Sequence, residues 1–532
     1  MRPSVVLSLS IAIVPAASQQ IWDIWQTTWD RSKLFTSLAP SSPINFVTPG
    51  PAASADIVVN DAVEYQPIAG FGASLTDSSA LTLNNLKSKN SANYWSILGH
   101  MFSTSYAADA AGLSYIRVPI GASDFSANTY SLDDVSGDTS LSHFNINNIP
   151  SYVFSVLKDI QSINSAIKIH LCPWSPPAWM KDSGTMNGGN LQSQYTGVYA
   201  NYLLKAVQGF QNQGLPVYAI SIQNEPQNSN PTYPTCTMTP TVMGQIGTSL
   251  RSLLNSNGLS GVQIIGYEHN WDDANAYPVT LFIKAFVLIC TRKMNSYSSA
   301  FSGVAFHCYA GSVSNQAQFH NAWPSKAQCT GTFGSDWWSD IKGLMWNLAL
   351  DGNGNPKLPG TNSCGGPGCR PLVTVNSDGS YSYNQEFYAM AQASKAIIPK
   401  DPGGPFGQRI GVTVQGSLSW ALVVGAYVVR RVNPSDWLQY SIVVLNWDDS
   451  ASTTWNPQPV TATIEFRGMQ ATYTFPVGAT TLWWFAPATS NGKIVNDAKN
   501  STESPIKVFT SDSAQPSKNA TKLQFNATHI PL

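Results

Sequence analysis

Short apolar runs rich in β-branched and aromatic residues recur through the middle of the chain, and each ends in a polar or aromatic cluster. Stretches with a helix-like pattern, such as Tyr195–Gln213, separate these runs. Apolar strands that alternate with helices predict a parallel sheet built from βα units. The predicted strands are Ile68–Ser74, Leu113–Ile120, Ile167–Trp174, Val217–Asn224, Val262–Glu268 and Val304–Tyr309.

Six or more βα units favour a closed (β/α)8 barrel, the TIM barrel, over a doubly wound sheet. The doubly wound alternative would place a glycine-rich phosphate turn after its first strand. The segment Ala69–Ser74 lacks the third glycine of that fingerprint. We therefore expect an α/β fold in which residues 64–404 form the barrel.

The pattern changes after about residue 405, where strands separated by turns follow one another with little helix signal. The segment Ile44–Val63, before the barrel, is also strand-like and rich in proline. We expect residues 19–63 and 405–487 to form one attached β-sandwich with a structural role. Its later strands are predicted at Ser441–Asn446, Val460–Phe466, Gln470–Phe475 and Thr481–Phe485.

Both ends of the chain have the composition of an exported protein. Residues 1–18 combine a cationic start, a short apolar run and small residues, which is typical of a signal peptide. The run is too short to span a membrane. The tail 488–532 is polar, predicted to be disordered, and carries the glycosylation sequons at Asn500, Asn519 and Asn526. We expect a secreted, extracellular glycoprotein without a membrane-spanning segment.

Composition and cysteine content narrow the function further. Charged residues make up 11% of the chain and the net charge is −1, so no basic field exists to hold nucleic acid. The sequence shows no metal-ligand spacing, no serine–histidine elbow and no phosphate loop, and we expect a monomer without metal or cofactor. Of seven cysteines, Cys364 and Cys369 could close a small loop, and further pairing stays open.

In a TIM barrel the active site lies at the carboxyl ends of the strands. Glycoside hydrolysis by the usual route needs two carboxyl groups there. The chain holds only six glutamates, and of these only Glu225 and Glu268 end predicted barrel strands. The residues that end these strands are Asp77, Arg117, Asp124, Trp174, Asn224, Glu225, Glu268, His307 and Tyr309.

An ordered set of motifs makes the chain resemble glycoside hydrolase family 30 from about residue 40 to 487. That family includes glucosylceramidases and fungal endo-β-1,6-glucanases. The resemblance implies a barrel with an attached β-sandwich and a retaining mechanism with two glutamates. The motifs are Gly70–Asp77, Tyr115–Ser126, Pro173–Lys181, Gln223–Pro226, Ala305–Gly311 and Trp346–Leu350.

The resemblance also implies roles for single residues. Glu225 would be the acid/base on the fourth strand, and His307 and Tyr309 would support the nucleophile from the sixth. The substrate would be bound by Asp77, Arg117, Trp174, Asn224 and Trp346. The implied activity is retaining hydrolysis of β-glucosidic bonds, in a carbohydrate such as β-1,6-glucan or in a glycolipid such as glucosylceramide, and the sequence leaves that choice open.

The chain departs from the family at the nucleophile. Members carry a glutamate in an aromatic-Thr-Glu-Cys-Thr-Gly segment at the end of the seventh strand. The segment Lys326–Thr332 has Gln328 in that place, and the run that should precede it is absent. Too few residues remain before Leu344 for a complete seventh βα unit. Glu268 is a weak substitute, and either a damaged transcript or an inactive carbohydrate-binding pseudoenzyme would explain the pattern.

Overall fold

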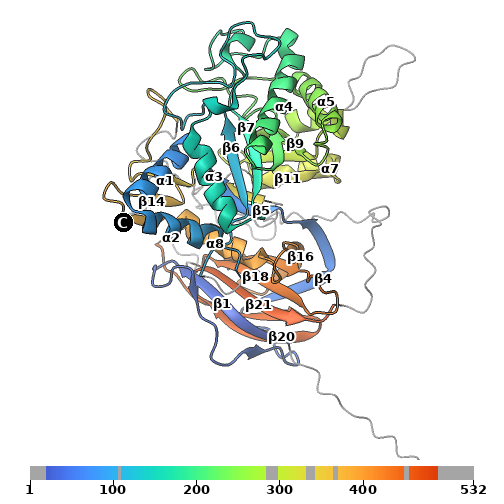
Figure 1. Cartoon of the computed structure of the whole chain (residues 1–532). Coiled ribbons are helices and arrows are strands. Elements are labelled where there is room, and N and C mark those ends of the chain that lie inside the picture. Colours follow the sequence, from blue (N-terminus) through green and yellow to red (C-terminus); the bar gives the residue numbers. More distant parts are fainter. Residues whose placement is uncertain are drawn as a thin grey trace, which may run out of the picture. The chain divides into compact units, whose positions relative to one another are not determined.

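A computed structural model describes residues 19–105, 109–282, 297–330, 342–363, 370–448 and 454–488. Eight parallel strands in it close into a barrel (Figure 1). This confirms the predicted α/β barrel. The barrel strands are β5 (Gly70–Ser74), β6 (Tyr115–Ile120), β7 (Lys168–Pro173), β8 (Val217–Ser221), β9 (Gln263–Asn270), β10 (Gly303–His307), β11 (Ala327–Thr330) and β12 (Lys342–Met345).

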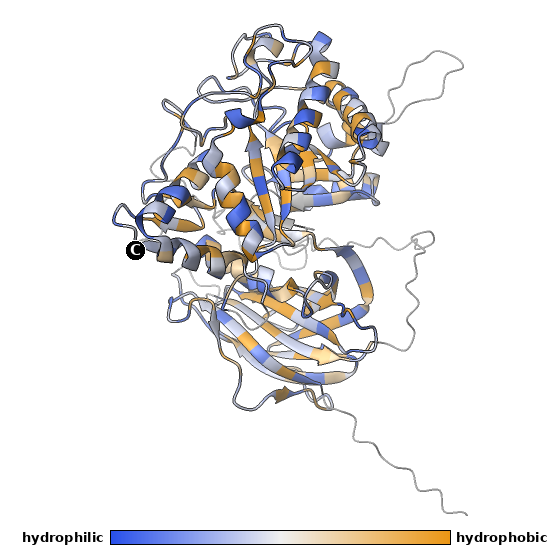
Figure 2. Cartoon of the chain, in the orientation of Figure 1, coloured by the Kyte–Doolittle hydropathy of each residue, from blue (hydrophilic) through white to orange (hydrophobic). Residues whose placement is uncertain are grey.

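The helices around the barrel are amphipathic. In α3, for example, Val153, Leu157 and Ile160 recur at helical spacing and are buried. The helices carry hydrophobic and hydrophilic residues on the same ribbon (Figure 2). Their bounds are α1 (Asp77–Lys89), α2 (Ser91–Phe102), α3 (Ser151–Ile163), α4 (Thr196–Asn212), α5 (Pro240–Ser256), α6 (Tyr277–Phe282), α7 (Gln316–Ala322) and α8 (Gln385–Ile397).

Strands from both ends of the described chain form the second sheet structure, as the sequence predicts. They are joined in the order β2-β1-β21-β18-β17-β16-β4-β19-β20, with β3 paired to β1. The bounds are β1 (Gln20–Thr28), β2 (Thr36–Ser37), β3 (Ile44–Asn45), β4 (Ala55–Pro67), β16 (Gln408–Gln415), β17 (Leu422–Val429), β18 (Leu438–Asn446), β19 (Val460–Phe466), β20 (Met469–Phe475) and β21 (Gly478–Ala486).

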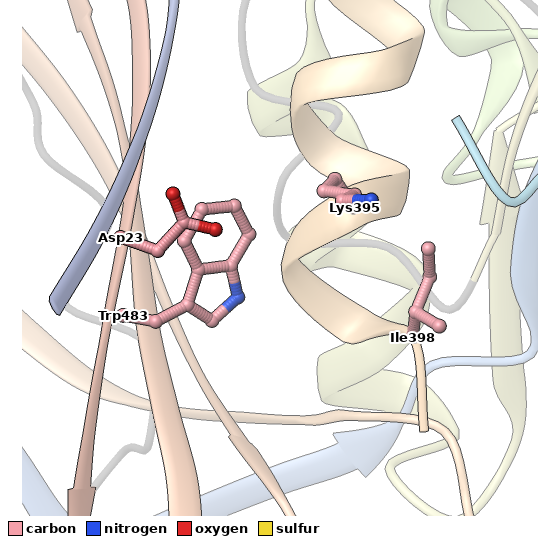
Figure 3. Close-up of a pocket in the computed structure, with 4 residues that line it drawn as sticks. All are labelled: Asp23, Lys395, Ile398 and Trp483. Atoms are coloured by element: carbon pink, nitrogen blue, oxygen red, sulfur yellow. The ribbon is translucent and has the colours of Figure 1, made fainter. Parts of the chain in front are cut away.

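Helix α8 packs against this sandwich. The amide of Gln392 donates to Thr27 of β1 (3.1 Å) and accepts from Thr481 of β21 (2.6 Å). Asp23 and Trp483 project from neighbouring strands toward Lys395 and Ile398 at the end of the helix (Figure 3). Burial lowers the pKa of Lys395 to about 8. Barrel and sandwich are therefore joined by buried polar groups as well as by apolar contact.

A small sheet joins β12 to α8, and it is formed by β13 (Ala349–Leu350), β14 (Val373–Val375) and β15 (Tyr381–Tyr383). Leu348 donates its backbone N–H to Ser74 at the end of β5, Leu372 donates to Asn347, and Asn384 donates to Leu372. This ladder places the amino end of α8 at the rim formed by the carboxyl ends of the barrel strands.

The seventh βα unit differs from the sequence expectation. A short seventh strand is present: β11 pairs with β10 at four positions and with β12 at Thr330 and Gly343. What is shortened is its crossover, because only residues 331–341 connect β11 to β12 whereas residues 174–216 connect β7 to β8. A crossover with its helix takes at least about 10–12 residues, so residues 331–341 are at the lower limit. The barrel thus closes around a reduced seventh unit.

Several sequence expectations lie outside the described residues. These are the signal peptide at 1–18, the pairing of Cys364 with Cys369, and the tail with Asn500, Asn519 and Asn526. Within the described ranges, no helix has the length and apolar character needed to cross a membrane.

Candidate active site

Glu225 follows β8 at the carboxyl end of the barrel. Its backbone N–H donates to the carbonyl of Glu268 on β9 (2.8 Å), and its φ is +47°. A left-handed conformation is uncommon for a residue with a side chain, and such strain gathers at functional sites. β8 itself ends at Ser221, and beyond it Asn224 forms an isolated bridge with Glu268, after which Pro226 cannot donate a ladder hydrogen bond.

Two donors hold the Glu225 carboxylate. His307 Nδ1 lies 3.0 Å from Oε1, and Asn228 Nδ2 donates to Oε2 (2.8 Å). Burial by itself would raise the pKa of Glu225. The hydrogen bond from His307 and the electrostatic interactions with His307 and His269 outweigh it and lower that pKa to about 2. The carboxyl group is therefore ionised at neutral pH, whereas a proton donor for glycoside cleavage needs a raised pKa.

An aromatic wall stands beside this carboxylate. The rings of Trp174 and Trp346 stack with centroids 5.0 Å apart and planes at 20°, and Phe125 meets Trp346 edge-on. The Arg117 guanidinium carbon lies 4.5 Å from the Trp174 ring centroid and 5.9 Å from that of Trp346. Arg117 of β6 and the tryptophans directly after β7 and β12 thus converge.

Arg117 also connects this wall to Glu268 and Asn224. Its Nη2 donates to Asn224 Oδ1 (2.6 Å), and its Nε lies 3.2 Å from Glu268 Oε1. Ser221 donates to the other oxygen of Glu268. The Arg117 and Glu268 side chains are 4% and 1% exposed. Glu268 is thus a buried partner of Arg117, and this geometry argues against its use as a substitute nucleophile.

Two buried aspartates complete the rim. Asp77 Oδ2 accepts from Ser126 (2.6 Å) and Tyr130 (2.9 Å), and Ser363 donates to Asp124. Burial raises the pKa of Asp77 and of Asp124 to about 6 in each case. The sequence patterns did not single out Ser126, Tyr130 or Ser363 as partners, because hydroxyl residues are common and only the fold brings them to these carboxylates.

The raised pKa of Asp77 predicts a pH dependence of stability. Its folded-state value of about 6 exceeds the ordinary 3.8, so the folded protein holds the proton more tightly than the unfolded chain. The stabilisation is present below pH 4 and is lost as the pH rises to about 6. We expect Asp77→Asn to remove about 3 kcal/mol of the change in unfolding free energy between pH 4 and pH 7.

Urea unfolding at a series of pH values measures this contribution. Asp138→Asn is the matched comparison, because hydrogen bonds from Ser140 and His143 lower the pKa of Asp138 and its pH effect has the opposite sign. An unchanged pH profile in Asp77→Asn would contradict the prediction.

The family motif would put Gln328 at the carboxyl end of the seventh strand, but the structure places it earlier in that strand. It is the second residue of β11, not the last, and pairs with Val304 of β10. Paired residues of neighbouring strands point to the same side of a sheet. Val304 packs in the main hydrophobic core with Phe301 and Phe319, so Gln328 faces the helices and not the barrel axis. Gln328 is buried, and its Oε1 has no hydrogen-bond partner among the described residues.

His269 was not among the predicted site residues, yet it lies beside Glu225 and His307. Potential ligand atoms of these three residues lie within 4.8 Å of one another. A carboxylate and two imidazoles form a donor set that zinc and related metals accept. The three come from different strands, so no sequence spacing reveals the group. Tyr309 is 63% exposed, and its ring meets His307 edge-on at 6.1 Å.

A carboxylate and an aromatic wall at the carboxyl end of a (β/α)8 barrel define the class as a carbohydrate-active enzyme. The model of the glycosyl hydrolase family 30 TIM-barrel domain matches residues 68–259. The chain belongs to glycosyl hydrolase family 30, a family of glycosidases. An endo-1,6-beta-D-glucanase of Neurospora crassa is 32% identical over 452 residues, which cover 79% of this chain and 86% of that relative.

Further relatives fit the same family. The lysosomal acid glucosylceramidase of Mus musculus is 29% identical, over 31% of this chain and 32% of that protein. A solved endo-beta1,6-glucanase superposes with a TM-score of 0.71 at 24% identity, covering 87% of this chain and 99% of its own. At that identity the superposition shows the shared fold.

Proposed function

We propose that this chain binds an extracellular β-1,6-glucan at the side chains grouped around Glu225, which are Arg117, Trp174, Asn224 and Trp346 and which we call the sugar pocket. The observation that carries the proposal is the convergence of Glu225 with the Trp174–Trp346 stack and the Arg117–Asn224 hydrogen bond. The match to a named endo-1,6-glucanase reaches 32% identity over 79% of this chain, whereas a putative glucosylceramidase of Caenorhabditis elegans is 26% identical over 66% of it. This difference favours a polysaccharide over the sphingolipid headgroup. The leader-like start supports secretion.

The side chains assign a role to each part of the pocket. A glucose ring would rest against the partly exposed indole of Trp346, which offers apolar area to its C–H groups, while the buried Trp174 ring stacks on Trp346 and holds it in place. Asp77 and Asp124 would accept hydrogen bonds from sugar hydroxyls. Glu225 would donate a proton to the glycosidic oxygen and later take one from water. For the first step its pKa must rise, which a second carboxylate close by would cause.

In the part of β11 that the structure describes, no glutamate is present to act as that second carboxylate. Gln328 is neutral and faces the helix layer, and Glu268 is paired with Arg117. No covalent glycosyl intermediate can form on a neutral amide. We infer that the family's retaining hydrolysis is lost in this chain while the sugar pocket is kept. The chain would then act as a carbohydrate-binding protein. This holds whether the nucleophile was lost during evolution or through a damaged transcript.

Calorimetric titration with a short β-1,6-linked gluco-oligosaccharide, gentiotriose, tests the pocket. We expect the full chain to bind it, and Trp174→Ala to weaken the affinity at least tenfold because Trp346 and Arg117 lose the ring that they pack against. Trp95→Ala is the control, since Trp95 lies on α2 and is 40% exposed. Tighter binding of octyl β-glucoside than of gentiotriose would favour a glycolipid, and no binding of either would overturn the proposed function.

A further inference from the structure

Four of the exposed tryptophans of the sandwich lie in contact with one another in pairs. Trp29 is 55% exposed, Trp420 39%, Trp447 46% and Trp455 42%. They form two pairs: Trp29 with Trp455, and Trp420 with Trp447, each with ring centroids 5.4 Å apart. Exposed indoles are costly in water, and clusters of them mark interaction sites. We call these four residues the tryptophan platform.

The sheet register places both pairs at the same end of the sandwich. Thr28 of β1 pairs with Gly478 of β21, which pairs with Asn446 of β18, which pairs with Leu422 of β17. Trp29 and Trp447 each follow this row by one residue, and Trp447 donates its backbone N–H to Ala421, next to Trp420. The strands lie side by side in Figure 1. Trp29 and Trp447 therefore follow strands roughly 10 Å apart, because one strand separates them.

This end of the sandwich is turned toward the catalytic rim of the barrel. Thr27 and Thr481 contact Gln392 in the second half of α8, and Arg31 acts electrostatically on Tyr388 in its first turn. β1 and α8 therefore run in opposite directions beside each other. The end of β1 that leads to Trp29 lies near the amino end of α8. That end lies at the carboxyl ends of the barrel strands, through the backbone bonds of Asn384, Leu372 and Leu348.

We propose that the tryptophan platform is a second carbohydrate-binding surface, which holds a β-linked glucan chain at a distance from the catalytic pocket. The proposal rests on the proposed function for its choice of polymer. Indole faces pack on the apolar C–H faces of pyranose rings, and the indole N–H groups can donate to their hydroxyls. Two indole pairs on separate strands suit successive units of a chain better than a single sugar. Their position on the rim side matches a polymer that also enters the pocket.

Depletion of the full chain from solution by insoluble β-1,6-glucan measures the platform. We expect the double variant Trp29→Ala/Trp447→Ala to weaken retention at least tenfold, with gentiotriose affinity within twofold of the parent. Trp95→Ala is the matched exposed-tryptophan control and should be retained like the parent. Thermal melting of each variant checks that the fold is kept.

Trp174→Ala separates the two sites. If the platform holds the polymer, this variant loses gentiotriose binding but is still retained by the glucan. Equal retention of the parent and the double variant, or no retention of the Trp174→Ala variant, would overturn the platform, even where gentiotriose binding upholds the pocket. Loss of gentiotriose binding in the parent with retained polymer would overturn the proposed function and leave the platform standing. If the platform binds a protein partner and no glucan, the surface is a protein interface and the proposal is overturned.

Discussion

The purified chain as given is expected to hydrolyse aryl β-glucosides no faster than the buffer background. A retaining glycosidase holds its two carboxyl groups about 5–5.5 Å apart. Gln328 is level with Val304, three residues before the His307 that contacts Glu225. That offset corresponds to roughly 10 Å along the strand. Position 328 is thus too deep in the barrel wall and faces the wrong side to serve as the nucleophile.

A single Gln328→Glu substitution should therefore restore no activity and should lower stability. The new carboxylate would stand in the apolar layer between β11 and the helices, where an unpaired charge is costly. Gln328→Leu is the comparison and should be neutral or stabilising, because the Gln328 Oε1 is already buried without a partner among the described residues. Melting temperatures of the two variants measure the difference, and a Gln328→Glu protein with strong activity would refute the placement.

Rebuilding the seventh unit should succeed where the single change fails. Rebuilding β11 as a full strand of roughly five residues that ends in Thr-Glu-Cys, with the glutamate level with His307, would bring a carboxylate to the strand end. Its charge would also raise the pKa of Glu225 toward the range an acid needs. We expect hydrolysis with retained anomeric configuration, followed by product NMR. Clear activity of the unmodified chain that is lost on Glu268→Gln would instead make Glu268 the nucleophile.

The second large effect is expected at the buried ion pair of Arg117 and Glu268. Both side chains are almost fully buried, so removing one charge leaves the other uncompensated. Glu268→Leu should lower the free energy of unfolding by about 3–5 kcal/mol. The double change Arg117→Met/Glu268→Leu should recover a large part of that loss, because neither charge then remains. Chemical denaturation of both variants provides the measurement.

A partly exposed ion pair supplies the control. Lys87 and Asp159 lie 2.6 Å apart with side chains 33% and 18% exposed. Lys87→Met should cost about 1 kcal/mol or less. If Glu268→Leu lowers the free energy of unfolding no more than Lys87→Met does, the buried ion pair does not stabilise the fold in the way we expect.

Strand positions were predictable wherever side-chain character repeats with a clear period. Val460–Phe466 was predicted at the bounds that β19 has, and the predicted strand Val217–Asn224 contains β8. The small sheet β13–β15 was missed, because its strands are two or three residues long and carry no periodic pattern. Short strands form only where neighbours already offer hydrogen-bonding edges, which a linear pattern does not record.

The sequence predicted which residues gather at the site better than it predicted where their side chains point. Trp174, Arg117 and Asn224 were expected from predicted strand ends and Trp346 from the family motif, and the structure brings the four together. The side on which Gln328 points depends on the pairing of β11 with β10. A shift of one residue reverses the face of every side chain in a strand. Family motifs fix neither that register nor the hydrogen-bond partners of Asp77.

The pairing of β1 with β21 sets a condition on synthesis. Gln26 and Thr480, which meet across these strands, are 454 positions apart. At roughly 5–20 residues per second, the ribosome takes on the order of 20–90 s to supply the partner of the first strand. During that interval Ile21, Ile24 and Trp25, which are buried in the folded protein, have no β21 to cover them. The nascent chain therefore exposes the apolar residues of β1 throughout translation of the barrel. We expect the yield of folded protein to depend on chaperones for this reason.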